Sequence, residues 1–166
     1  WSVASPLLTD YQYLVLNDSA AVATLGQTIH SYSNTTFGIR NSYQTSNGYD
    51  LVFYAFHSVA GYQKIGTYTG TAGSFTVYTT DNGASGGANG FRPRFVMIKR
   101  VDAAGGNWVI IDEPRGSGSI RVYPNSTSAE HSGQGESFSS TGFSPRPSST
   151  GDTNISGATY LYLAIA

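Results

Sequence analysis

The chain offers few side chains for metal binding. Its three histidines, His30, His57 and His131, are far apart in the sequence, and cysteine is absent. A zinc site needs closely placed imidazole or thiolate ligands, so each histidine is interpreted as an ordinary surface or core residue. Residues 81–83 and 151–154 offer Asp and Asn oxygens, but neither stretch has the alternating spacing of a dedicated calcium loop. We therefore expect no metal and no other cofactor.

The acidic residues do not form a catalytic pattern. Glycoside hydrolysis needs two carboxylates roughly 5–10 Å apart across one bond, whereas Asp112 and Glu113 are adjacent and would point to opposite faces of a strand. Residues 116–119 lack the Gly-x-Ser-x-Gly spacing of a nucleophile elbow, and residues 83–90 lack the Lys-Ser/Thr of a phosphate loop. We expect Asp112 to form an ion pair with Arg115 or to cap a turn, and we expect no enzymatic activity.

The chain contains 12 tyrosines, and this abundance is the feature of the sequence that indicates ligand binding. Tyrosine rings stack on the apolar faces of sugars, while amides and hydroxyls satisfy the sugar hydroxyl groups. The alternative is that alternating tyrosines pack inside a sheet with their hydroxyls at its rim. The candidate ligand contacts are the tyrosines expected outside strands or at strand ends: Tyr11, Tyr32, Tyr43, Tyr49, Tyr62 and Tyr68.

The overall composition excludes several classes of partner. Charged residues make up 11% of the chain, against about 25% in typical soluble domains. A formal net charge of −1 provides no electrostatic basis for binding nucleic acid or anionic lipid. No apolar run approaches the roughly 18 residues that a membrane span needs. The chain starts at Trp1 with neither Met nor a signal peptide, so we expect a processed product or part of something longer.

The elements that must position these residues are strands, and the clearest are in residues 90–116. Two apolar runs, 95–98 and 108–111, flank the reversal signal Gly105-Gly106-Asn107. Glycine and asparagine tolerate the positive φ angles of a tight turn, which predicts a β-hairpin. Both runs are apolar at consecutive positions, so both faces of this hairpin should be covered, and we expect it at the centre of the core.

β-Branched and aromatic residues between turn clusters predict an antiparallel β-sandwich, jelly-roll or lectin-like. Irregular connections are expected at 81–90 and 144–154. The expected strands cover residues 11–16, 51–56, 75–80, 95–101, 108–112, 119–123 and 159–165.

Residues 1–57 repeat landmarks of the last third of the chain at offsets of 106 to 109 residues. The order of the landmarks is conserved between the two stretches, which predicts a duplication. Residues 1–57 would be the second half of one repeat unit, and residues 58–166 a complete β-sandwich unit. The matching pairs are Trp1 with Trp108, 14–20 with 122–129, 37–40 with 143–146, and 48–56 with 157–165.

A partial unit of this size has too few strands to cover its own apolar faces. The side chains of Val52, Tyr54 and Phe56 should therefore be buried by something else. We expect residues 1–57 to pack on 58–166, with a homo-oligomer or upstream residues as the alternatives. Because Trp1 and Trp108 hold equivalent repeat positions, we expect both in the core.

The hairpin region also carries an ordered series of short motifs. In chain order they are Gly90-Phe91-Arg92-Pro93, Phe95-Val96-Met97-Ile98-Lys99-Arg100, Asn107-Trp108, and Asp112 followed by Arg115-Gly116, with further matches at 59–62, 66–70, 124–126, 129–130, 140–143 and 157–160. The series resembles a β domain repeated in bacteriophage tail-fibre and virion surface proteins, over roughly residues 55–166. Glu113-Pro114 departs from that pattern.

The resemblance implies a non-enzymatic module at the virion surface, outside the cell, in a tail fibre or related appendage that attaches to host-surface glycan. It also implies contacts with other virion subunits and a homo-oligomer, with a trimer favoured. Two alternatives remain: a carbohydrate-binding module of a secreted bacterial enzyme, and a purely structural capsid-decoration or fibre protein. The structural motif residues are Gly90, Phe91, Pro93, Lys99, Trp108, Asp112, Arg115 and Gly116.

Overall fold

The computed structural model describes residues 1–9, 11–24, 29–33, 35–39, 50, 52–80, 89–116, 118–133, 135–148 and 152–166. Within these residues all strand pairings are antiparallel and no helix occurs, which confirms the predicted all-β class. The strands are β1 (Ser2–Val3), β2 (Gln12–Val15), β3 (Ala23–Thr24), β4 (Ile29–Tyr32), β5 (Phe37–Ile39), β6 (Gln63–Thr69), β7 (Val77–Tyr78), β8 (Phe95–Arg100), β9 (Val109–Asp112), β10 (Arg121–Val122), β11 (Ser137–Ser139), β12 (Gly142–Ser144) and β13 (Thr159–Ile165).

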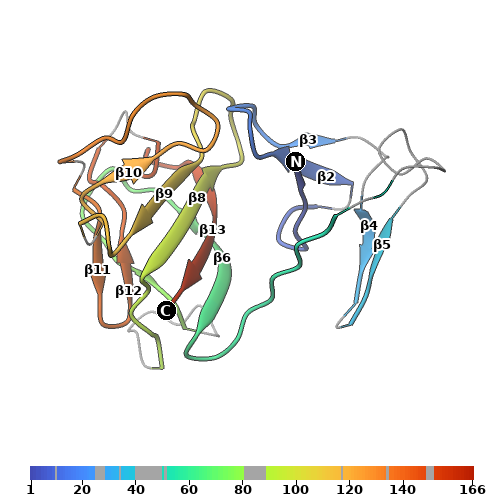
Figure 1. Ribbon diagram of the computed structural model, residues 1–166, viewed down its shortest axis with the longest axis horizontal. Helices are drawn as coiled ribbons and strands as arrows, with labels where there is room; N and C mark the ends of the chain where they lie inside the picture. The colour runs from blue at the N-terminus through green and yellow to red at the C-terminus, as the bar shows by residue number, and fades with distance from the viewer. Residues whose placement is uncertain are drawn as a thin grey trace.

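The predicted hairpin forms the middle of a five-stranded sheet with the order β10-β9-β8-β13-β6 (Figure 1). β8 and β9 pair with Met97 opposite Ile110, and Gly105 in the turn has a φ of 89°. On its other edge β8 pairs with β13. Val96 and Ile98 of β8 are fully buried, so this hairpin does lie at the centre of the core.

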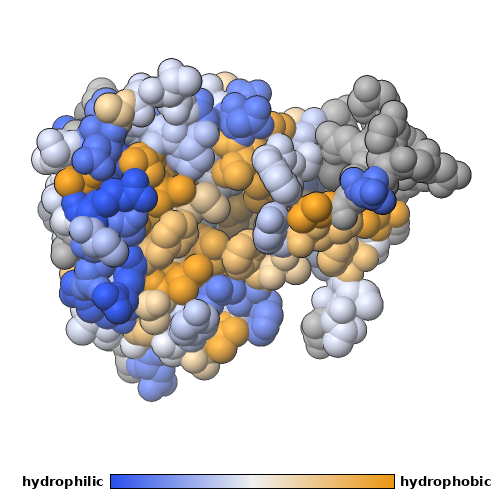
Figure 2. Space-filling model, viewed as in Figure 1, coloured by the Kyte–Doolittle hydropathy of each residue, from blue (hydrophilic) through white to orange (hydrophobic). Residues whose placement is uncertain are grey.

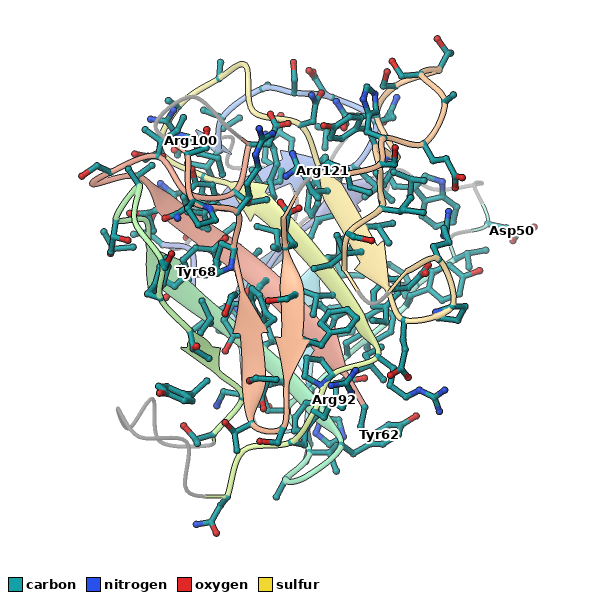
Figure 3. The ribbon with its side chains drawn as sticks, turned by 90° about the vertical axis from the view of Figure 1, so that its left-hand side faces the viewer. Asp50, Tyr62, Tyr68, Arg92, Arg100 and Arg121 are labelled. Atoms are coloured by element: carbon teal, nitrogen blue, oxygen red, sulfur yellow. The ribbon has the colours of Figure 1, made fainter. Side chains whose placement is uncertain are left out.

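A second sheet, with the order β11-β12-β7, packs on one face of the five-stranded sheet (Figures 1 and 3). Alternate side chains of each strand point into the space between the layers, so apolar residues from both sheets interdigitate in a β-sandwich-like arrangement. The main core consists of Val77, Phe91, Val96, Ile98, Val109, Ile111, Phe143, Ala158, Tyr160, Tyr162 and Ala164. Whether the topology is jelly-roll or lectin-like stays a prediction.

The opposite face of the five-stranded sheet is partly covered by the described beginning of the amino-terminal segment (residues 1–57), around β1 to β3. Leu8 and Leu14 form a second core cluster with Val101, Trp108 and Leu161. The part of the chain around β1 to β3 therefore packs on the five-stranded sheet, while the assignment of residues 1–57 as a partial repeat unit stays a prediction. In Figure 1 the strands β1 to β5 lie to the right of the sandwich, joined to β6 by an extended arm.

Several predicted strands are present and one is wrong. Residues 11–16, 95–101, 108–112 and 159–165 contain β2, β8, β9 and β13, and residues 75–80 and 119–123 contain the shorter β7 and β10. Residues 52–56 belong to no strand, because no strand of the described chain pairs with them; Leu51 lies outside the described residues. The seven-residue β6 was not predicted, nor were β1, β3, β4, β5, β11 and β12.

The core tyrosines predict that the protein loses stability in alkali. Burial raises the pKa of Tyr68, Tyr160 and Tyr162 above 10, for Tyr162 to about 12. Because the unfolded tyrosines ionise at lower pH than the folded ones, stability is complete below about pH 10 and falls as the pH rises toward 12. The loss from Tyr162 alone should reach roughly 2–3 kcal/mol.

Urea unfolding at pH values from 9 to 12, monitored by tyrosinate absorbance, measures this effect. The substitution Tyr162→Phe should make the free energy of unfolding depend less on pH. Burial lowers the pKa of Lys99, so this lysine changes the free energy of unfolding with pH in the opposite direction. Its contribution is complete near pH 10.5, the ordinary pKa of lysine. The slope is therefore compared above pH 10.5. A free energy of unfolding that stays constant there would contradict the expectation.

Candidate functional site

The structure separates the tyrosines that the sequence singles out. Tyr11 precedes β2 with a φ of 65°, Tyr32 ends β4, and Tyr62 precedes β6 with its side chain exposed. In Figure 3 Tyr62 and Tyr68 lie at different heights of the sandwich. These residues therefore do not come from one loop cluster. Two further candidates, Tyr43 and Tyr49, lie outside the described residues.

Tyr68 has an interior position that does not suit a ligand contact. Its ring stacks on the ring of Tyr160, with centroids 5.0 Å apart, and packs against Phe75 and Phe143. Its hydroxyl donates a hydrogen bond of 2.7 Å to the carbonyl oxygen of Thr153. Among the tyrosine candidates, Tyr68 thus follows the alternative interpretation, a ring packed inside the sheet with a satisfied hydroxyl.

The motif residues before β8 shape the backbone. The Phe91 N–H donates to Oγ1 of Thr79 at 2.8 Å, and the same hydroxyl donates to the Phe91 carbonyl oxygen at 2.6 Å. A Cβ atom at Gly90 would lie 2.5 Å from the carbonyl oxygen of Thr141, so a side chain would collide with backbone. Phe91 and Pro93 are both buried. These residues serve packing.

Lys99 and Trp108 bind the amino-terminal segment to the sandwich. The Lys99 ammonium is buried and donates to the carbonyl oxygens of Gly106 and Ser19, at 2.6 and 3.1 Å. The Trp108 indole N–H donates to the carbonyl oxygen of Val15 at 2.9 Å. Burial lowers the pKa of Lys99, and the two carbonyls stabilise its proton-bearing form. Two motif residues therefore hold a neighbouring part of the chain.

The acidic motif residues take part in ion pairs at the end of β9. As expected, the Asp112 carboxylate forms an ion pair with Arg115, 2.8 Å from its Nε atom. The same carboxylate accepts a hydrogen bond of 3.0 Å from the Arg115 backbone N–H, which caps the turn before Gly116. Glu113 accepts from Arg92 at 3.0 Å and from Arg94. The two arginines lower the pKa of Glu113.

A buried ionic cluster at β10 was not predicted from the sequence. Arg121 and Glu136 form an ion pair with both side chains almost completely excluded from solvent. Thr153 Oγ1 donates to the same Glu136 oxygen at 3.1 Å, and Asp152 lies 3.6 Å from Arg121. The residues are 15 and 17 positions apart in the sequence, so no local pattern indicates that they meet.

Metal-binding clusters and membrane-spanning helices are not found in the described part of the chain. No three His, Cys, Asp or Glu side chains gather there in a way that could hold an ion. No helix there is long and apolar enough to cross a bilayer.

The most distinctive surface is apolar and lies on the described part of the amino-terminal segment, including residues 52–56 at its end. Figure 2 shows apolar side chains over the face of the five-stranded sheet and on the neighbouring amino-terminal lobe. Trp1, expected in the core, is 65% exposed and contacts the ring of Tyr54, which is 72% exposed. The strongly exposed large side chains are Trp1, Leu7, Tyr11, Phe37, Ile39, Val52, Phe53, Tyr54, Phe56, Val59 and Tyr62.

Large exposed apolar patches are typical of protein or membrane interaction sites and of ligand-binding grooves. The fold and this surface define an antiparallel β-sandwich-like protein with an uncovered apolar segment on its amino-terminal side. The chain belongs to the family described as Domain of unknown function (DUF7483), which matches residues 1–166. No curated protein and no solved structure matches the chain significantly.

Proposed function

We propose that the chain is a non-enzymatic structural module at the surface of a bacteriophage virion, in a tail fibre or related appendage that serves host attachment. The observation that carries the proposal is the set of exposed apolar side chains in the described part of residues 1–57, among them Trp1, Val52, Tyr54 and Phe56, which suits a protein that works as one part of a larger assembly. The resemblance supports it as well, because its motif residues build the central hairpin and hold the neighbouring segment.

Host-surface glycan is the ligand that the proposal assigns to the polar surface. Tyr11 and Tyr62 are exposed and could stack on sugar rings. Self-association, with a trimer favoured, belongs to the same proposal, since Phe95, Met97 and Leu163 leave the outer face of the five-stranded sheet only half covered. A purely structural role without a ligand is the second candidate, and the number of exposed apolar side chains favours it.

A glycan array probed with the purified chain tests the attachment role. Retention on a bacterial surface polysaccharide should fall about tenfold in Tyr62→Ala, because an aromatic contact contributes roughly 0.5–1.5 kcal/mol beyond the area that it buries, and about 1.4 kcal/mol corresponds to tenfold. Tyr54→Ala removes another exposed tyrosine, 72% against 56% for Tyr62, from residues 52–56 and serves as the matched control. A blank array for the unmodified chain would support the purely structural role.

Sedimentation equilibrium, run in parallel, should give a trimer mass, and a monomer at all concentrations would contradict self-association.

A further inference from the structure

Residues 52–56 form an extended apolar arm without a strand partner in the described chain. Val52, Phe53, Tyr54 and Phe56 are all strongly exposed. An extended apolar segment with unpaired backbone groups is a template for strand pairing. The pairing pattern of the two halves of the chain indicates which strands it would accept.

The first strands of the amino-terminal segment pair as β9 and β10 do. In β1 and β2, Val3 lies opposite Leu14, while in β9 and β10, Ile110 lies opposite Val122. The corresponding residues are 107 and 108 positions apart. The next pairing repeats too. Tyr13 of β2 lies opposite Ala23, and 108 positions later Arg121 forms a bridge with His131.

The second hairpin of each half has the same register as well. Tyr32 of β4 lies opposite Phe37 of β5, and Phe138 of β11 lies opposite Phe143 of β12. The pairs Ser31 with Gly38 and Ser137 with Ser144 follow the same rule. All four residues of the first hairpin are displaced by 106 positions from those of the second. Shared register over two hairpins supports the predicted duplication.

One ring contact places the arm at the position of β13. Phe37 contacts Phe53 with ring centroids 5.4 Å apart, and the corresponding Phe143 contacts Tyr162 of β13 with centroids 5.2 Å apart. The arm therefore lies against β5 as β13 lies against β12. Its environment differs: Tyr162 is 4% exposed, whereas Phe53 is 49% exposed.

The missing cover corresponds to β6 and β8. β13 pairs with β6 from Thr159 to Ile165 and with β8 from Tyr160 to Ile165, so both of its edges are satisfied. The arm has neither neighbour in the described chain. A second copy of this chain cannot supply both neighbours, because its β8 is already paired on both edges, with β9 and with β13.

We propose that residues 52–56 are the central strand of a second β-sandwich, which is completed by a front half-unit joined directly to Trp1. This front half-unit would provide two strands with the sequence pattern of β6 and β8, one for each edge of the arm. In the complete sandwich β8 is followed by Trp108 after the short connection 101–107. Because Trp1 is the counterpart of Trp108, the donor strand enters Trp1 by an equivalent connection.

The test is an extended chain in which a second copy of residues 58–107 is placed directly before Trp1. Amide hydrogens of residues 53–56 should exchange about a hundredfold more slowly than in the 166-residue chain, because ladder hydrogen bonds and burial protect them. Residues 58–107 contain no tryptophan, so Trp1 can be followed alone in a Trp108→Phe background. Its quenching by acrylamide should fall in the extended chain.

The control is the same extended chain with Val96→Asp in the added copy, because Val96 is fully buried in β8. It should retain the fast exchange of residues 53–56. A second chain, with residues 1–107 placed before Trp1, carries the donor strands in a longer native context in case the first extension folds poorly. Unchanged exchange at residues 53–56 in both chains, or failure of both to fold, overturns the proposal. Glycan binding has no part in this test, so a blank array leaves it standing.

Discussion

Replacing Glu136 with glutamine is expected to lower the free energy of unfolding by about 3–5 kcal/mol, because the change leaves the Arg121 guanidinium buried without its partner. The side chains of Arg121 and Glu136 are 2% and 0% exposed, so water cannot replace the lost carboxylate. Asp152 is 3.6 Å from Arg121 and compensates only in part. Urea or guanidinium unfolding at neutral pH measures the loss.

Glu113→Gln is the matched control, since it breaks ion pairs with Arg92 and Arg94 at a solvent-exposed site. Exposed ion pairs contribute at most about 1 kcal/mol. The double variant Arg121→Met with Glu136→Leu should recover much of the stability lost in Glu136→Gln, because it removes both buried charges together. Similar losses for Glu136→Gln and Glu113→Gln would contradict the assignment of a buried charge pair.

The central hairpin could be predicted from the sequence because its signals are local. Apolar runs in β8 and β9 and the glycines of the turn lie within a short stretch of chain. β6 gave no such signal, since Gln63, Lys64, Thr67 and Thr69 make its pattern polar. Its stability comes from pairing with β13 along seven residues, a contact that spans most of the sandwich in sequence.

The opposite error occurred at residues 51–56, where a strong apolar pattern predicted a strand. A strand requires a partner for its backbone groups as well as suitable side chains, and the described chain provides none for residues 52–56. The same reasoning applies to Trp1, whose residue type predicts a core position but whose cover is missing. The side-chain pattern indicates that a segment can form a strand, and the neighbouring backbone decides whether the strand forms.

The candidate site shows the same division. Ion pairing of Asp112 with Arg115 was predictable because the residues are three positions apart. The contacts of Lys99 with Ser19 and of Trp108 with Val15 depend on how the amino-terminal segment packs, which no local pattern reveals. Composition alone does not tell which tyrosines are exposed. Tyr68 packs inside the protein, whereas Tyr62 lies on its surface.

Trp108→Ala is expected to destabilise the protein by about 3–5 kcal/mol, the usual cost of removing a large buried aromatic side chain. Trp108 is 2% exposed and packs with Leu14 and Leu161 between the sandwich and the amino-terminal segment. Its loss also leaves the Val15 carbonyl oxygen without the indole N–H that it accepts. The substitution should therefore loosen residues 1–24 as well, and limited proteolysis should cut there first.

Trp1→Ala removes the counterpart at the equivalent repeat position and should cost less than about 1 kcal/mol, since surface substitutions have small effects. The fluorescence of the two variants separates the environments, because each keeps a single tryptophan. Trp108→Ala should show the red-shifted, readily quenched emission of an exposed indole, and Trp1→Ala a blue-shifted, protected one. Equal losses of stability would mean that Trp1 is covered in solution. Equal emission spectra would show the same thing, and the amino-terminal side would then not be open.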